Sequence, residues 1–229
     1  MEVDPNAGPS ATAIGMDSKI RRGTSADAEF LAWVMLSASR GHVNRGIWDL
    51  LIGADDAGCL EYLRRLAVAE PRSLCHYESF WIADVEGRPA AALCGFEFRA
   101  GGWATVAQAK WKVQRDLLWS DADFAASDKR MAPLWSCFLP DVGADWGIEN
   151  VATRTEFRGQ GLAQALLLHV AGEGRERGCK LAQIATTLGN NAALSVYQRC
   201  GFRWSGEKRC EVVESTLGAA GFVRLLREL

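Results

Sequence analysis

The turn at residues 158–163 holds the residues of this sequence that are best suited to bind an anionic ligand. A short apolar run precedes the turn and a leucine-rich segment follows it directly. Glycine allows backbone dihedral angles that other residues avoid, and it lets the chain pass close to a ligand. The start of a helix adds unpaired N–H groups and the positive end of a dipole. The residues predicted to hold a diphosphate are Arg158, Gly159, Gln160, Gly161, Leu162 and Ala163.

Two other phosphate-binding turns fit this stretch less well. A dinucleotide-binding turn has Gly or Ala at its sixth position and an acidic residue about 20 positions later. Here Gln164 takes the sixth position, and the strand-like residues 180–186 end without an acid. A P-loop needs Gly-Lys-Ser/Thr after four residues, and the sequence lacks it. These departures disfavour a nucleotide-binding oxidoreductase and a P-loop enzyme.

A second candidate segment begins at Asn190, which follows the strand-like residues 181–187. Asn190 is a good N-cap, and Gly201 is a good residue to end a helix. A short helix is therefore expected between them, with Tyr197 seven residues after the Asn and Phe202 directly after the Gly.

Together the two segments resemble motifs A and B of the GNAT superfamily of N-acetyltransferases, over residues 147–202. Motif A of that family reads Arg/Gln-x-x-Gly-x-Gly/Ala, which Arg158, Gly161 and Ala163 match. Motif B has the same spacing of Asn, Tyr and Gly-Phe. The resemblance implies an acetyl-CoA-dependent N-acetyltransferase in which the acceptor amine attacks the thioester directly, without a metal.

The resemblance also assigns roles to residues around the two motifs. Val151, Ala152 and Thr153 would offer backbone groups to the pantetheine arm, and one of their N–H groups would polarise the thioester carbonyl. Asn190 would contact the cofactor or an ordered water. Tyr197 would act as general acid, because its helix brings the phenol close to the departing sulfur.

The general base is less well defined by the sequence. Many members of the family carry a Glu on the fifth strand, five positions before the Asn, but this chain has Ala185 there. Glu149 on the fourth strand is the alternative, and strand alternation would place it on the same face as Val151 and Thr153. Deprotonation through water, or an amine that arrives neutral, would need no base at all.

The resemblance implies an α/β (α+β) fold: a mixed, twisted sheet of about six to seven strands with helices on both faces. Apolar periodicity places strands at residues 19–23, 80–85, 89–98, 148–153, 181–187, 202–213 and 222–226. Helices are expected at residues 24–39, at 47–69 with a break near residues 53–58, at 160–177 and after Asn190. Residues 100–146 form a helical insertion between the third and fourth strands, rich in Trp. It serves either as a lid over the acceptor or as a helical pair for stability or dimerisation.

Length and composition agree with one N-acetyltransferase domain at residues 19–229, after a disordered tail at residues 1–18. The net charge of −2 argues against a nucleic-acid binder, and no apolar run has membrane-spanning length. Seven scattered cysteines suggest reduced thiols and a cytoplasmic location.

The acceptor has no motif of its own in the sequence. A small-molecule amine (an amino acid, a polyamine or an antibiotic) is favoured by the weakly acidic, Trp-rich periphery. A protein N-terminus or lysine stays open, and so does a non-catalytic acyl-CoA-binding regulatory protein. A homodimer is compatible with the insertion.

Overall fold

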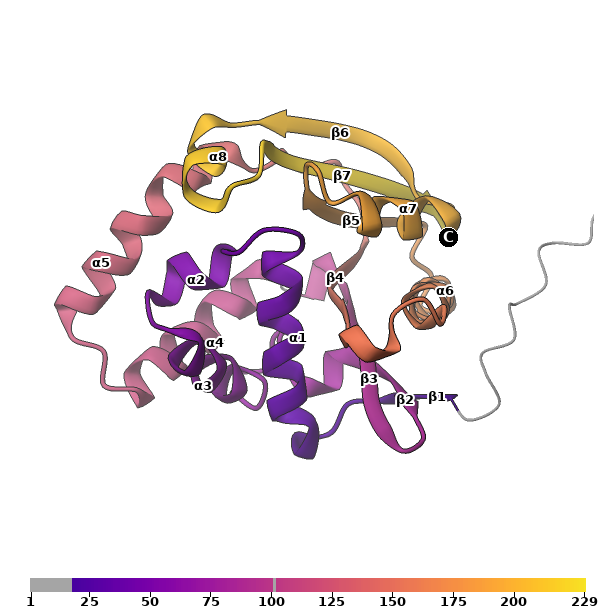
Figure 1. The fold of residues 1–229 in the computed structure, drawn as a ribbon, viewed down its shortest axis with the longest axis horizontal. Helices are drawn as coiled ribbons and strands as arrows, with labels where there is room; N and C mark the ends of the chain where they lie inside the picture. The colour runs from indigo at the N-terminus through magenta and orange to yellow at the C-terminus, as the bar shows by residue number, and fades with distance from the viewer. Residues whose placement is uncertain (1–17, 101) are drawn as a thin grey trace, which may run out of the picture.

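A seven-stranded sheet forms the centre of the computed structural model, which describes residues 18–100 and 102–229 (Figure 1). The strands are β1 (Ser18–Arg22), β2 (Phe80–Val85), β3 (Arg88–Glu97), β4 (Trp146–Thr153), β5 (Leu181–Thr187), β6 (Arg203–Arg209) and β7 (Gly221–Glu228). Their order is β1-β2-β3-β4-β5-β7-β6, and only β4 and β5 run parallel. The predicted mixed sheet of six to seven strands is confirmed.

Helices cover both faces of this sheet, as predicted (Figure 1). They are α1 (Ala28–Arg40), α2 (Ile47–Ile52), α3 (Asp56–Leu66), α4 (Gly102–Asp116), α5 (Asp121–Met131), α6 (Leu162–Glu176), α7 (Asn191–Arg199) and α8 (Glu211–Leu217). We call the face packed against α1 to α5 the α1 face and the face packed against α6 and α7 the α6 face, since each carries its own apolar cluster. In the part of the chain that the structure describes, no helix is long and apolar enough to cross a membrane.

The connection between β3 and β4 contains α4, α5 and a 3-10 helix, Ala132–Cys137, which confirms the predicted helical insertion. Its tryptophans do not form one stripe. Trp103, Trp111 and Trp135 are more than half exposed, whereas Trp119 packs against Tyr62 of α3. The insertion packs beside α2 and α3, and its last turn contacts α8.

Two predicted segments, the N-terminal tail and the strand at residues 202–213, end at different residues in the structure. Residues 1–17 of the predicted tail lie outside the described residues, and Ser18 is already the first residue of β1. The predicted strand at residues 202–213 is wrong at its end, because β6 stops pairing with β7 at Arg209 and α8 begins at Glu211. Glu211 and Glu214 lie in the first turn of α8, where acidic side chains favour a helix start.

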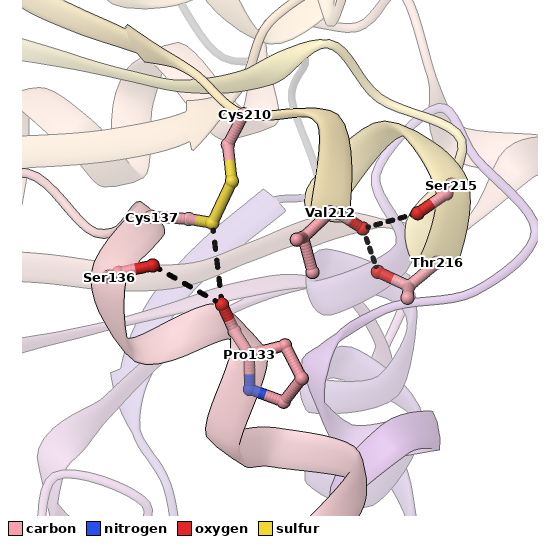
Figure 2. The surroundings of a disulfide bond; sticks show 7 residues. All are labelled: Pro133, Ser136, Cys137, Cys210, Val212, Ser215 and Thr216. Atoms are coloured by element: carbon pink, nitrogen blue, oxygen red, sulfur yellow. Dashed lines mark hydrogen bonds between the residues drawn. A yellow bond between two sulfur atoms is a disulfide. The ribbon is translucent and has the colours of Figure 1, made fainter.

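A disulfide joins the insertion to the β6–β7 arm (Figure 2). Cys137 ends the 3-10 helix of the insertion, Cys210 directly precedes α8, and their Cα atoms lie 5.8 Å apart. The prediction of reduced thiols is therefore wrong for this pair, because the fold brings together two cysteines separated by 73 positions. The cysteines that remain free are all buried: Cys59, Cys75, Cys94, Cys179 and Cys200.

Candidate functional site

A cavity of about 1230 Å³ opens where β4 and β5 separate. The two strands pair only over three residues, from Trp146 to Ile148 on β4, and β4 then continues beside β3 alone. The predicted site residues that line this cavity are Glu149, Val151, Ala152, Thr153, Arg158, Gly159, Gly161, Leu162, Ala163, Asn190 and Tyr197. Gln160 is exposed in the turn and does not line it.

A bulge in β4 assigns its side chains to the two faces of the sheet. Ala92 and Cys94 are two residues apart on β3, but they oppose Ala152 and Glu149, which are three apart on β4. The extra residue is Asn150, whose φ of 57° lies in the left-handed region. The predicted alternation is wrong for this reason: Glu149 shares the α1 face with Ala152.

Val151 lies on the opposite side of the strand from Glu149. Its side chain packs into the apolar cluster of the α6 face, together with Ile148. The bulge therefore lets one strand present an acid to the α1 face and an aliphatic side chain to the α6 face within three residues.

The turn before α6 leaves a run of backbone donors without partners. The amides of residues 159–164 donate no hydrogen bond to any described residue, whereas that of Ala165 already bonds to the carbonyl of Gly161. Gly159 and Gly161 have φ values of 79° and 77°, and a Cβ at either would meet no atom within 4 Å. The glycines are needed for the backbone conformation, and the space beside them is open.

Arg158 extends the positive charge of this turn. Its own amide bonds to Thr155, and its Nε donates to the carbonyl oxygen of Thr153 at 3.3 Å. The guanidinium is exposed at the rim of the cavity. The helix start and this side chain therefore place positive potential on the same end of the cavity.

Asn190 is held in place by the protein itself. Its Oδ1 accepts from the amide of Ala193 at 3.4 Å, and its Nδ2 donates to Oγ1 of Thr186 at 3.0 Å. The side chain thereby caps α7 and ties the helix to β5. This arrangement fixes the position of Tyr197 two turns later.

Tyr197 is a buried phenol that also lines the cavity. Burial, followed by the charge of Glu149, raises the pKa of this phenol. Tyr197 is therefore protonated throughout the neutral range, as a proton donor must be.

Glu149 carries a carboxyl group that titrates near neutrality. Its side chain makes no hydrogen bond or ion pair with the described residues, and burial raises its pKa to about 7. Such a group can accept a proton at physiological pH and return it to solvent. On β5, the adjacent position is occupied by Ala185, which also lines the cavity and cannot titrate.

The basic residues of the cavity to which sequence reasoning assigned no role are Arg199, within motif B, and three residues outside both motifs. Lys110 comes from α4, Arg224 from β7, and His42 follows α1 with its Nδ1 3.4 Å from Oγ1 of Thr187. Each lies far in sequence from the two motifs, and neither periodicity nor spacing marks it. The insertion also contributes Trp103 and Trp135 to the lining.

Comparison with known families agrees with this geometry. The family model of the GNAT acetyltransferases matches residues 54–202, more than half of the chain. The protein therefore belongs to the GNAT acetyltransferase family, and it is an acetyltransferase.

Solved structures show the same fold at low sequence identity. One described as an acetyltransferase is 15% identical with a TM-score of 0.65, over 92% of this chain and 98% of its own. An N-acetyltransferase from Staphylococcus aureus Mu50 is 16% identical with a TM-score of 0.60, over 91% and 99%. A polyamine N-acetyltransferase of Drosophila melanogaster, which forms N-acetylagmatine, is 16% identical with a TM-score of 0.52, over 93% and 100%. No curated protein matches the chain.

Proposed function

We propose that this acetyltransferase uses acetyl-CoA to acetylate the amino group of a small molecule. The observation that carries the proposal is the run of unpartnered amides at residues 159–164, at the positive end of α6 and beside Arg158. A diphosphate satisfies several such donors at once and gains from the helix dipole. Residues 159 and 161–163 line the cavity, so a diphosphate held there leads the rest of the coenzyme inward.

The pantetheine arm would follow the edge of β4. Beyond Ile148 that strand has no partner on the β5 side, so the backbone groups of residues 151–153 that point to that side are not paired with another strand. The arm would enter between the diverging strands and end near Tyr197 and Glu149. When bound, acetyl-CoA supplies the activated acetyl group.

Two proton transfers accompany the transfer of the acetyl group. The new bond joins the amine nitrogen to the acetyl carbon, and the carbon–sulfur bond breaks. Glu149 takes the proton from the amine, directly or through one water, because the pKa of its carboxyl is about 7. Tyr197 gives its proton to the departing sulfur, and the raised pKa of the phenol keeps that proton available.

A panel of amines, assayed by release of the CoA thiol from acetyl-CoA, tests this function. Release that depends on an amine, and that falls in Tyr197→Phe, is the expected result. Tyr77→Phe is the matched control, because Tyr77 carries a phenol outside the cavity lining. Binding of acetyl-CoA without thiol release for any amine would instead support a non-catalytic acyl-CoA-binding protein.

A further inference from the structure

Arg224 is a buried cation in the wall of the cavity. Its side chain is only 6% exposed, and it forms no ion pair with any residue that the structure describes. One guanidinium nitrogen donates to the carbonyl of Pro140, while the buried Nε has no partner. Buried arginines are nearly always neutralised, because an uncompensated charge in the interior is costly. A ligand with negative charge would supply the missing partner.

The position of Arg224 relates it to the proposed base. Arg224 pairs directly with Ala185 across β5 and β7, and Ala185 follows the last residue of β5 that pairs with β4. Glu149, Ala185 and Arg224 therefore form a row across the α1 face. Paired strands lie about 4.8 Å apart, and β4 and β5 separate beyond Ile148, so the Cα atoms at the ends of this row are at least about 10 Å apart. A single small molecule can reach both side chains over the methyl group of Ala185.

The coenzyme's diphosphate would not fill this position. The amides proposed to bind it start α6, whose apolar side chains lie on the α6 face, together with Val151. Arg224 alternates with Val223 and Leu225, which belong to that same cluster, so its own side chain lies on the α1 face. Phe138 of the insertion and Phe222 of β7 stack beside it, with ring centroids 5.2 Å apart.

A second cation supports the same assignment. Lys110 of α4 lines the cavity, is half-buried and makes no ion pair within the described ranges. Burial lowers the pKa of its ammonium, against the opposing charge of Asp128. Two cations on the walls repel an acceptor that carries a second positive charge, such as a polyamine, and attract one that carries an anion.

We propose that the acceptor is an amine that also carries a carboxylate, as amino acids do, and that Arg224 binds this carboxylate. The inference rests on the proposed acetyltransferase function, since it names the substrate class of the same site. A guanidinium matches a carboxylate with two parallel hydrogen bonds, and its planar fork fixes the orientation of the bound group. The carboxylate held at Arg224 orients the amine toward Glu149.

Matched substrate pairs test the proposal in the unaltered enzyme. Phenylalanine is compared with phenethylamine, tryptophan with tryptamine, and arginine with agmatine, and kcat/KM is measured for each by thiol release. We expect at least one amino acid to exceed its decarboxylated partner by tenfold or more, as one charged hydrogen-bond pair commonly provides about that factor. Ratios at or below one for every pair would refute the proposal.

Substitutions of Arg224 test whether this residue provides the selectivity for the carboxylate. Arg224→Met should reduce the preferred ratio by at least tenfold, mainly by raising KM for the amino acid. Arg224→Lys, which keeps the charge but not the planar fork, should restore part of it. Arg227→Met is the matched control, because Arg227 lies on the same strand, does not line the cavity and should leave the ratio unchanged. An equal loss of the ratio in Arg227→Met, or an unchanged ratio in Arg224→Met, would overturn the assignment.

A binding measurement separates this inference from the proposed function. Calorimetry of phenylalanine and phenethylamine on the CoA-bound protein requires no turnover. Tighter binding of phenylalanine that disappears in Arg224→Met would support the anion site even if no amine were acetylated. If Arg224→Met instead weakened the binding of CoA tenfold or more and left the amino acid selectivity unchanged, Arg224 would be assigned to the coenzyme and the inference would be refuted.

Discussion

Replacing Glu149 with Gln tests the proposed base through two independent properties of the protein. The substitution removes the charge and nearly preserves the shape of the side chain. Burial raises the pKa of Glu149 from 4.5 to about 7. At about 1.4 kcal/mol per pKa unit, this rise corresponds to at most about 3 kcal/mol.

The sign of the effect on stability follows from proton binding. The folded protein holds the proton of Glu149 more tightly than the unfolded chain does, because its pKa is higher in the folded state. The contribution of Glu149 to the free energy of unfolding should therefore fall as pH rises from 4.5 to 7 and level off above that range. Glu149→Gln has no proton to lose. The variant should match the native protein near pH 4 and be more stable than it near pH 8, by at most about 3 kcal/mol.

Glu149→Gln should lower the activity of the enzyme, although it should raise the stability near pH 8. A base with a pKa of about 7 is about one-tenth ionised at pH 6, so kcat/KM should rise about tenfold from pH 6 to its plateau. Glu149→Gln should lose about a hundredfold in kcat and retain only the pH dependence that comes from the amine's own ionisation.

Urea denaturation between pH 4 and pH 8, together with kcat/KM over the same range, measures both effects. Glu156→Gln is the control, since Glu156 is an exposed carboxylate in the short helix before the turn. A stability difference that stays constant from pH 5 to pH 8 would show that Glu149 does not titrate near neutrality. An unchanged rise of kcat/KM in the variant would remove Glu149 from the mechanism.

Three further changes have defined outcomes. Tyr197→Phe should lower kcat by roughly ten- to a thousandfold with little change in acetyl-CoA affinity, as single-turnover kinetics and calorimetry will show. Gly161→Ala should weaken the binding of acetyl-CoA by roughly tenfold, because the φ of 77° at this position disfavours any side chain. Gly172→Ala, within α6 and facing open space, should instead raise the melting temperature. Removing the disulfide with Cys137→Ser and Cys210→Ser should reduce the free energy of unfolding by about 2–4 kcal/mol in urea, since the bond closes a loop of 73 positions; an unchanged midpoint would contradict that reasoning.

The features that the sequence predicted correctly are those set by short-range chemistry. Gly159 and Gly161 do adopt positive φ, and Asn190 does cap the helix that carries Tyr197. In each case, residues a few positions apart determine the local backbone. The elements of the sheet follow from apolar periodicity for the same reason, so their existence and order were predictable.

The remaining features depend on contacts between distant parts of the chain. The bulge at Asn150 has no marker in the residues around it, so simple alternation placed Glu149 on the wrong face. Cys137 and Cys210 meet only because the insertion folds against the β6–β7 arm. Arg224 is a candidate binding residue because it is buried and lies opposite Ala185, and the sequence around it predicts neither property.

The bulge at Asn150 gives β4 one residue more than the facing stretch of β3. A regular strand that kept Asn150 in the alternation would place Glu149 and Val151 on the same face, because a shift of one position reverses which face each side chain occupies. The bulge absorbs this extra residue, so the carboxyl of Glu149 and the side chain of Val151 lie on opposite faces of the sheet. A variant that lacks Asn150 should therefore keep Glu149 and Val151 on their present faces, with regular alternation in place of the bulge.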